Sequence, residues 1–249
     1  MLLSNLQLTY EPYPIGVIMP VFEQGVYQEL LQTFPPLELF KFMPEHGNKY
    51  SLSERNNGKF YSDYIAKNSA WRELHRYVKS DEFVFGIIDS LRQGKIDLGI
   101  KRKDQKFGQR LKKLVRNVRA GRLPVTTSPI YSRFEFSVLP ADGGVVTPHT
   151  DAPKKFITLV VTMTAPGEWN TAWGGGTDIL KPKDPSENFN YFNRDLPYEQ
   201  CDTLRTVEFL PNQAMLFLKT FNSLHGVKAM SGPSGALRRT LTINIQRDY

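Results

Sequence analysis

Two histidines and one aspartate have the residue types and spacing of a metal site. His149 and Asp151 stand two residues apart, so on an extended backbone both side chains point to one face. A third ligand must come from a distant segment, and His225 is the candidate. Two imidazoles and one carboxylate bind Fe(II) and leave positions open for a chelating cosubstrate and O₂. A His-x-Asp pair by itself also occurs in capped turns and polar pairs, so its surroundings decide the interpretation.

A second group of polar residues lies on two predicted strands. Arg238 shares one face of its strand with Thr240 and two further polar side chains, while the other face is mostly apolar. The strand predicted over 156–164 has the same division, with Thr158 and Thr162 on its polar side. A guanidinium binds a carboxylate through two parallel hydrogen bonds. These polar faces either line a pocket or meet solvent.

The elements that must position these residues change type along the chain. In the first half, helical spacing of apolar residues predicts helices from Phe22 to Phe34, over 70–78 and over 82–91. From Val125 onwards, period-two alternation of β-branched and aromatic residues predicts strands. The predicted strands cover 129–138, 144–151, 156–164, 176–180, 205–210, 214–219 and 239–247. Residues 44–62 and 181–204 lack periodicity and are expected to be loops.

The order of these elements favours an α+β, mainly β fold. Several short strands without long helical insertions are typical of an antiparallel sandwich or jelly roll. A chain of 249 residues is long enough to bury a sizeable core. We therefore predict a single domain over 1–249, with a helical flanking region over 1–124 and a jelly-roll core over 125–249. Whether 181–204 closes over the site as a lid is left open.

The positive charge is concentrated in one segment. The net charge is +7, and residues 101–123 carry ten lysines and arginines against one acidic residue. Apolar residues at helical spacing within this segment predict an amphipathic helix over about 104–120. Its cationic face is either simply solvated or binds an acidic substrate, nucleic acid or an anionic membrane surface.

The composition excludes several classes of protein. Hydrophobic residues make up 40% of the chain and charged residues 23%, which is typical of a globular protein. No stretch approaches the roughly 20 apolar residues of a membrane span, and the first residues lack export signals, so we expect a cytoplasmic protein. The single cysteine, Cys201, excludes an internal disulfide and a cysteine-cluster metal site.

Five features in this order resemble the Fe(II)- and 2-oxoglutarate-dependent oxygenases, and among them the prolyl-hydroxylase-like branch. The features are His149-x-Asp151, Gly174–Thr177, Pro211–Phe217, His225-x-Val227 and Arg238-x-Thr240. The resemblance covers about residues 125–247. It implies a double-stranded β-helix core, and the predicted N-terminal helices are similar to those that flank this core in the family.

The resemblance also implies residue roles. His149, Asp151 and His225 would bind iron, and Arg238, with Thr240 beside it, would bind the distal carboxylate of 2-oxoglutarate. Arg238 is preferred to the next residue because the family pattern places Ser or Thr two residues after the arginine. The further candidates for the wall of the cosubstrate pocket are Thr162, Thr158, Tyr131 and Arg133. Thr162 matches a position where many relatives carry a tyrosine.

The implied reaction is hydroxylation of an unactivated C–H bond, with 2-oxoglutarate and O₂ converted to succinate and CO₂. Asp151 favours hydroxylation over halogenation, because halogenating relatives carry a small residue at that position. The family branch favours a protein or peptide side chain as substrate, and a small molecule or glycan precursor is the alternative. Demethylases of the alkylation-repair type carry a second arginine six residues after the first, and Asn244 at that position counts against nucleic acid.

Two other interpretations stay open. A non-catalytic jelly roll would bind an anionic partner through the predicted basic helix 104–120, with the three metal-ligating residues incidental. A hydrolase or isomerase of the cupin kind would hold Zn(II) or Mn(II) in the same triad. Arg238 is the feature that favours 2-oxoglutarate over this last interpretation, whereas the non-catalytic module would bind its partner equally with and without metal.

Overall fold

A computed structural model describes residues 1–102 and 130–247, and within them the protein combines helices with antiparallel sheet. The helices are α1 (Gln24–Gln32), α2 (Gly58–Lys67), α3 (Ser69–Val78) and α4 (Asp81–Gln93). The strands are β1 (Leu6–Thr9), β2 (Ile15–Ile18), β3 (Lys41–Met43), β4 (Lys49–Ser53), β5 (Ile130–Pro140), β6 (Val146–His149), β7 (Lys155–Thr162), β8 (Thr177–Pro182), β9 (Cys201–Val207), β10 (Ala214–Leu218), β11 (His225–Val227) and β12 (Leu237–Arg247). None of the described helices is long and apolar enough to cross a membrane. The basic helix expected over 104–120 lies outside the described residues.

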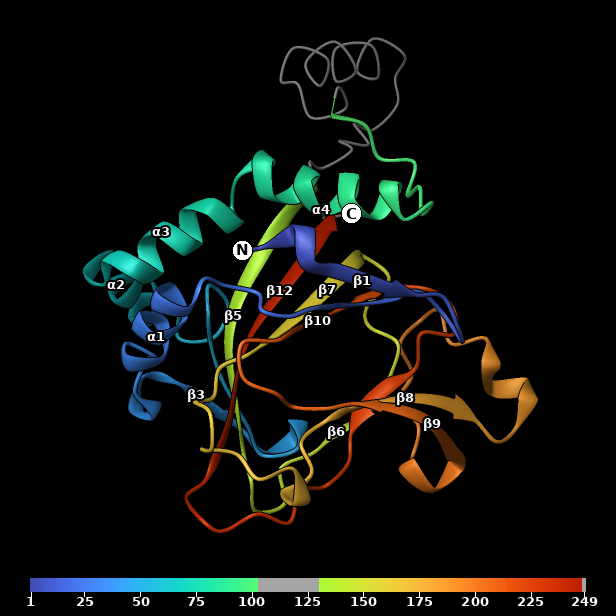
Figure 1. Ribbon diagram of the computed structural model, residues 1–249. Helices are drawn as coiled ribbons and strands as arrows, with labels where there is room; N and C mark the ends of the chain where they lie inside the picture. The colour runs from blue at the N-terminus through green and yellow to red at the C-terminus, as the bar shows by residue number, and fades with distance from the viewer. Residues whose placement is uncertain (103–129, 248–249) are drawn as a thin grey trace, which may run out of the picture.

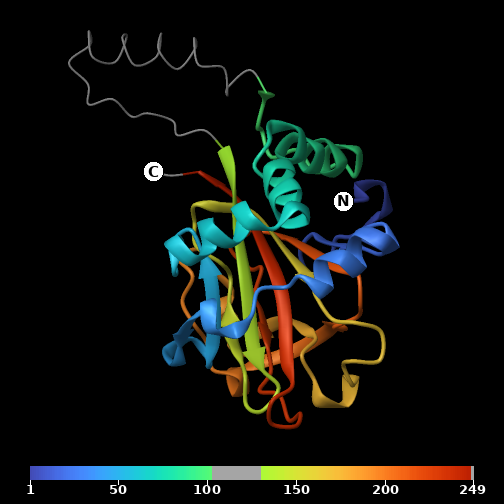
Figure 2. The same ribbon diagram turned by 90° about the vertical axis from the view of Figure 1, so that its left-hand side faces the viewer.

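The strands form two antiparallel sheets. The larger sheet has eight strands in the order β1-β2-β10-β7-β12-β5-β4-β3, and the smaller has four in the order β6-β11-β8-β9. Figure 1 shows the smaller sheet below the larger one, and the helices on the other side of the larger sheet. The turned view in Figure 2 agrees, with α2 and α3 in front of the strands they contact, β4 and β5. The larger sheet therefore has one face toward the helices and one toward the smaller sheet.

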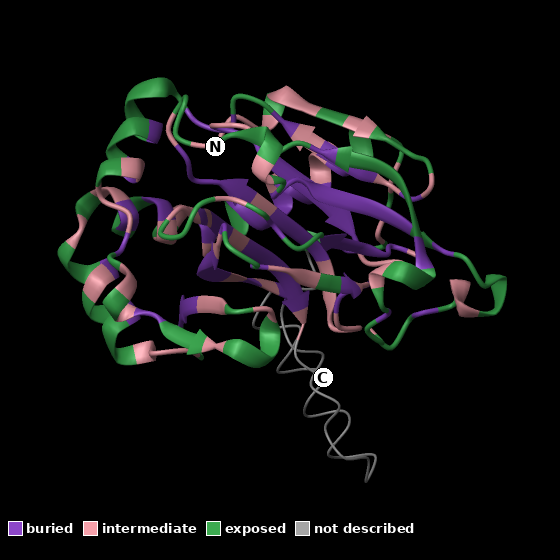
Figure 3. Ribbon diagram, turned by 90° about the horizontal axis from the view of Figure 1, so that it is seen from below, coloured by how far each residue is buried: buried purple, intermediate pink, exposed green. Residues whose placement is uncertain are grey.

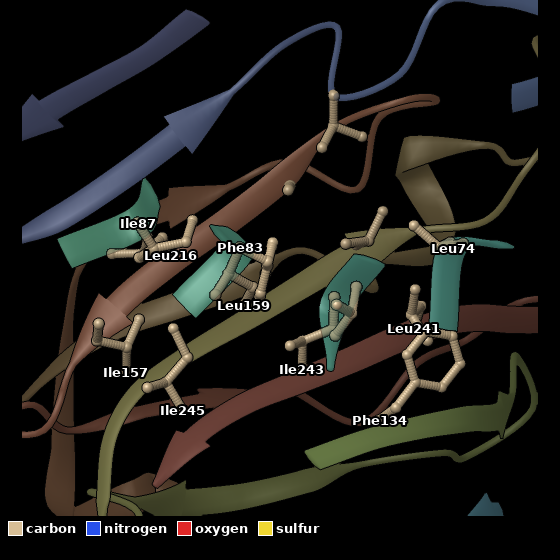
Figure 4. Close-up of a cluster of buried hydrophobic side chains, with 14 of the residues drawn as sticks. Leu74, Phe83, Ile87, Phe134, Ile157, Leu159, Leu216, Leu241, Ile243 and Ile245 are labelled. Atoms are coloured by element: carbon tan, nitrogen blue, oxygen red, sulfur yellow. The ribbon is translucent and has the colours of Figure 1, made fainter. Parts of the chain in front are cut away.

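The helix-facing side of the larger sheet forms the hydrophobic core. Leu159 of β7 and Leu241 and Ile243 of β12 are fully buried. They gather with Phe83 and Ile87 of α4 in the cluster drawn in Figure 4. Because side chains alternate across a strand, these apolar residues leave the intervening polar residues on the opposite face. The predicted division of both strands into an apolar and a polar face is confirmed.

Trp71 of α3 packs against the larger sheet. Its side chain is fully buried, its ring centroid lies 4.7 Å from that of Phe136, and its Nε1 donates to Thr33 O at 2.5 Å. We expect Trp71→Ala to lower the free energy of unfolding by about 3–5 kcal/mol in urea denaturation, because it leaves a large cavity. Phe60→Ala, at a half-exposed ring on α2, should change it by less than about 0.5 kcal/mol. Equal losses in the two variants would contradict the role of Trp71.

The N-terminal half contributes strands as well as helices. β1 to β4 all join the larger sheet, whereas only helices and loops were expected there. β4 lies within 44–62, which was expected to be a loop. That prediction was wrong because Lys49, Ser51 and Ser53 are polar, although they lie on the side of the strand that faces the interior. The polar residues thus removed the apolar alternation that marks a strand.

Two strands of the smaller sheet also differ from expectation. β9 begins at Cys201, inside the expected loop 181–204, and its middle residues are exposed at the edge of the sheet. An exposed edge strand lacks the buried alternation by which strands are detected. β11 was not predicted at all, because it is only three residues long and has Gly226 at its centre. Helix α2 was not predicted either, and its first residues lie within the expected loop 44–62, whereas the remaining helices and strands lie close to the predicted ranges.

Candidate active site

Three metal-ligating side chains meet where the smaller sheet faces the larger. His149 ends β6 and His225 begins β11, and these two residues are direct partners in the strand pairing. Asp151 follows β6 by two residues. One ligand atom from each of the three lies within 4.8 Å of the others. The structure thus brings together the three residues that the sequence singled out.

The backbone reaches Asp151 differently from the expected extended strand. β6 stops at His149, and Asp151 has a φ of 71°, in the left-handed region that residues other than glycine rarely adopt. Its carboxylate is buried and accepts hydrogen bonds from Lys155 Nζ and, at 2.8 Å, from Thr158 Oγ1. Such strained residues cluster at functional sites, where surrounding contacts hold them.

The charges around Asp151 keep its carboxyl group ionised. Burial alone would raise its pKa, but the nearby Lys155, His225 and His149 outweigh burial and hold the pKa well below its ordinary range. An ionised carboxylate is the form that ligates a metal.

The two histidines present the same ring nitrogen to the site. His149 Nδ1 lies 2.8 Å from Thr147 O, and His225 Nδ1 lies 2.9 Å from Ser223 O. An imidazole that donates Nδ1–H to a carbonyl carries its lone pair on Nε2, as metal-bound histidines commonly do. Burial lowers the pKa of His225 to about 3, so its ring is neutral at physiological pH. Two imidazole nitrogens and one carboxylate oxygen fit an Fe(II) ion.

These ligands line a cavity of about 480 Å³ between the sheets. Its wall on the larger sheet includes Thr158 of β7, Thr240 and Thr242 of β12, and Glu135 of β5. The two predicted polar faces therefore contribute to the wall of a pocket. Figure 3 shows buried residues concentrated in the central strands. The volume lies in the range of about 300–1,000 Å³ that is usual for small-molecule sites.

Arg238 lies on the cavity wall, while Arg239 faces the other way. Arg238 is buried, its Nε donates to Gly175 O at 2.6 Å, and its guanidinium carbon lies 4.6 Å from the Phe209 ring centroid. Burial lowers its pKa to about 10, which leaves the group charged at neutral pH. Arg239 pairs with Glu168 on the opposite face. Of these two adjacent arginines, Arg238 is thus the one within reach of a ligand in the cavity.

The remaining sequence candidates divide between the cavity and its surroundings. The candidates on the cavity wall are Thr240, Thr158 and Arg133. Thr162 lies with Arg238 in a small adjoining recess. Tyr131 lies at the start of β5, where its Oη accepts a hydrogen bond from Gln246 Nε2 at 2.6 Å. Thr162 and Tyr131 are therefore not brought to the main cavity beside the triad.

Five charged residues of the cavity wall were not among the sequence candidates: Glu45, Lys49, Glu135, Lys155 and Asp195. Glu135 alternates with Arg133 along a predicted strand, and Lys155 follows Asp151 by four residues, so both carried a usable signal. Lys49 carried none, because its strand β4 was not recognised.

Glu135 makes part of the stability depend on pH. Burial alone would raise its pKa, but Lys49 and Arg133 lower it to about 2. Its contribution is complete above the unfolded-state pKa of 4.5 and is lost as the pH falls toward 2. Over that interval we expect the unfolding free energy to fall by about 3 kcal/mol more in the wild type than in Glu135→Gln, measured by urea denaturation at each pH. Parallel pH curves for the two proteins would contradict this role.

Known proteins resemble this chain in structure only. No model of a known protein family and no curated protein matches the sequence. The non-heme α-ketoglutarate-dependent epimerase SnoN from nogalamycin biosynthesis aligns with a TM-score of 0.51 at 12% identity, over 93% of this chain and 78% of SnoN. HygX from Streptomyces hygroscopicus, solved with nickel and 2-oxoglutarate bound, gives 0.49 at 11% identity, over 94% and 83% of the two chains. A prolyl-4-hydroxylase from Pseudomonas putida gives 0.44 at 12% identity, over 94% and 92%.

The likeness to SnoN shows a shared fold, whereas the geometry of the site is observed in the structure of this chain. α-Ketoglutarate is another name for 2-oxoglutarate, so SnoN falls in the class that the sequence resembles. The His149, Asp151 and His225 group fits the metal of such an enzyme. The resemblance is therefore confirmed at the level of architecture: this chain has the fold of the Fe(II)- and 2-oxoglutarate-dependent oxygenases.

Proposed function

We propose that the protein is an Fe(II)- and 2-oxoglutarate-dependent dioxygenase that hydroxylates an unactivated C–H bond. The observation that carries the proposal is the His149, Asp151 and His225 group in the same cavity as the buried Arg238. Iron and 2-oxoglutarate, when bound, supply the oxidising chemistry, in which 2-oxoglutarate and O₂ become succinate and CO₂. The chain supplies the metal ligands, the orientation of the cosubstrate and a cavity between the two sheets.

Each side chain has one part in this scheme. The two histidine Nε2 atoms and the Asp151 carboxylate hold the metal, while the Nδ1 hydrogen bonds fix both rings. Thr158 holds one oxygen of Asp151 in place. Arg238, fixed by Gly175, binds the distal carboxylate of 2-oxoglutarate through its planar guanidinium, with Thr240 on the same face of β12.

The finer architecture belongs to the same proposal. We assign the two facing antiparallel sheets to a double-stranded β-helix, or jelly roll, within a single domain over 1–249. The N-terminal helices cover the outer face of the larger sheet, and the iron ligands lie on its inner side.

The cavity favours a small molecule as substrate. Its volume is about 480 Å³, and hydroxyl and charged side chains line it beside the triad. SnoN is an epimerase of nogalamycin biosynthesis, so this fold serves small-molecule chemistry in that protein. A protein or peptide side chain stays a prediction from the family branch.

An anaerobic titration tests the proposal. Metal-free protein receives Fe(II) and then 2-oxoglutarate, and the visible spectrum is recorded after each addition. We expect a broad charge-transfer band once both are present, because 2-oxoglutarate chelates the iron. Folded protein that gives no band would contradict the proposed function, and equal binding of an anionic partner with and without metal would favour the non-catalytic module.

A further inference from the structure

A cluster of charged residues lies on the cavity wall away from the triad. Lys49 of β4 and Arg133 of β5 flank the buried carboxylate of Glu135. Glu135 Oε1 accepts a hydrogen bond from Lys49 Nζ at 2.7 Å, and Oε2 forms an ion pair with Arg133 Nη2 at 3.0 Å. The hydroxyls of Ser51 and Ser137 donate to Oε1 as well, at 2.9 and 3.2 Å. All of these residues come from two adjacent strands of the larger sheet.

The cluster has more positive charge and more donors than its own carboxylate uses. Two cations flank one anion, which leaves one positive charge in excess. An ammonium has three donors and a guanidinium five. Arg133 Nη2 also donates to Ser53 Oγ at 3.2 Å, but Arg133 Nε is buried with no partner among the described residues. Buried donors without acceptors are costly, so the cluster suits a ligand that is rich in acceptor oxygens.

The cluster and the metal ligands face the same space at a distance that a small molecule can span. Thr158, which holds Asp151, is paired with Asn244 of β12, and Asn244 is paired with Arg133. Neighbouring strands lie about 4.8 Å apart, so the Thr158 and Arg133 backbones are separated by roughly 10 Å. A compact molecule with one group bound at Arg133 can therefore place one of its carbon atoms near the iron site.

The proposed cosubstrate binds a cation other than Lys49 and Arg133. In the proposed function one carboxylate of 2-oxoglutarate chelates iron and the other binds Arg238. Arg238 is paired with Leu139, near the opposite end of β12 from Asn244. Neither iron nor 2-oxoglutarate thus uses Lys49 and Arg133.

We propose that Lys49 and Arg133 bind an oxyanion of the substrate, a carboxylate or a phosphate, and that the substrate is a small anionic molecule. Glu135 holds the two cations in place through its ion pairs. The identification of this ligand as the substrate rests on the proposed function, but oxyanion binding is measurable without iron.

Isothermal titration calorimetry on the metal-free full chain tests the site, with inorganic phosphate in one arm and acetate in the other. We expect saturable binding of at least one probe, and the tighter probe shows whether phosphate or carboxylate is preferred. Arg133→Met should raise the dissociation constant about tenfold or more, because it removes charged donors. Lys41→Met, at an exposed lysine on β3, should change it less than about twofold.

A double variant distinguishes a loss of binding from a loss of folding. Lys49→Met leaves Glu135 short of one partner, so Lys49→Met with Glu135→Gln removes both charges together, and this variant should also bind about tenfold more weakly. No saturable binding of either probe, or a loss in Arg238→Met that Arg133→Met does not share, would overturn the inference. The chelate band tests the iron chemistry separately, so failure of either proposal is distinguishable from failure of the other.

Discussion

Asp151→Ala is expected to lower succinate formation from 2-oxoglutarate by about a hundredfold or more, because it removes the only carboxylate of the three-ligand group. His149→Ala should have a similar effect. The measurements are succinate released under air and iron retained after desalting. Both should fall together, since the loss of activity follows from the loss of metal.

The matched control is Asp202→Ala, at an exposed carboxylate of β9 outside the group. It should retain both iron and succinate formation. An Asp151→Ala protein with the turnover of the wild type would exclude this residue as an iron ligand, and would restore the interpretation in which the triad is incidental.

Arg238→Met is expected to raise the concentration of 2-oxoglutarate that half-saturates the chelate band by about a hundredfold, because it removes the buried guanidinium that we propose binds the distal carboxylate. The chelate itself should still form at high 2-oxoglutarate, because the iron ligands are unchanged. Methionine keeps most of the apolar stem, which limits the effect on packing.

Arg239→Met is the control for this prediction. The two arginines are adjacent in sequence, but Arg239 pairs with Glu168 on the other face of β12. Its replacement should change the half-saturating concentration less than about twofold. A large change in Arg239→Met with none in Arg238→Met would move the cosubstrate site to the other side of the sheet.

Thr158 and Thr162 show how far strand periodicity extends into the site. Both were placed on the polar face of one strand, and both are buried in the structure. Only Thr158 lines the main cavity, where it holds Asp151. Periodicity gives the face of a strand, whereas the position of the cavity along the strand depends on which distant segments cover it.

The sequence by itself determined the iron-ligand candidates and the side of β12 that carries Arg238. Residue type and a period of two are local properties, because successive side chains of a strand point to opposite faces. For the same reason the sequence separated Arg238 from Arg239 before any strand pairing was known.

Only the tertiary structure decided the rest of the site. β4 is too polar to be recognised locally, and β11 is too short and has a glycine at its centre. The two strands acquire their places by pairing with β5, β6 and β8. The Lys49 and Glu135 ion pair also joins segments that are far apart in the chain. Long-range pairing and burial supply the free energy that holds these features, and no local pattern encodes it.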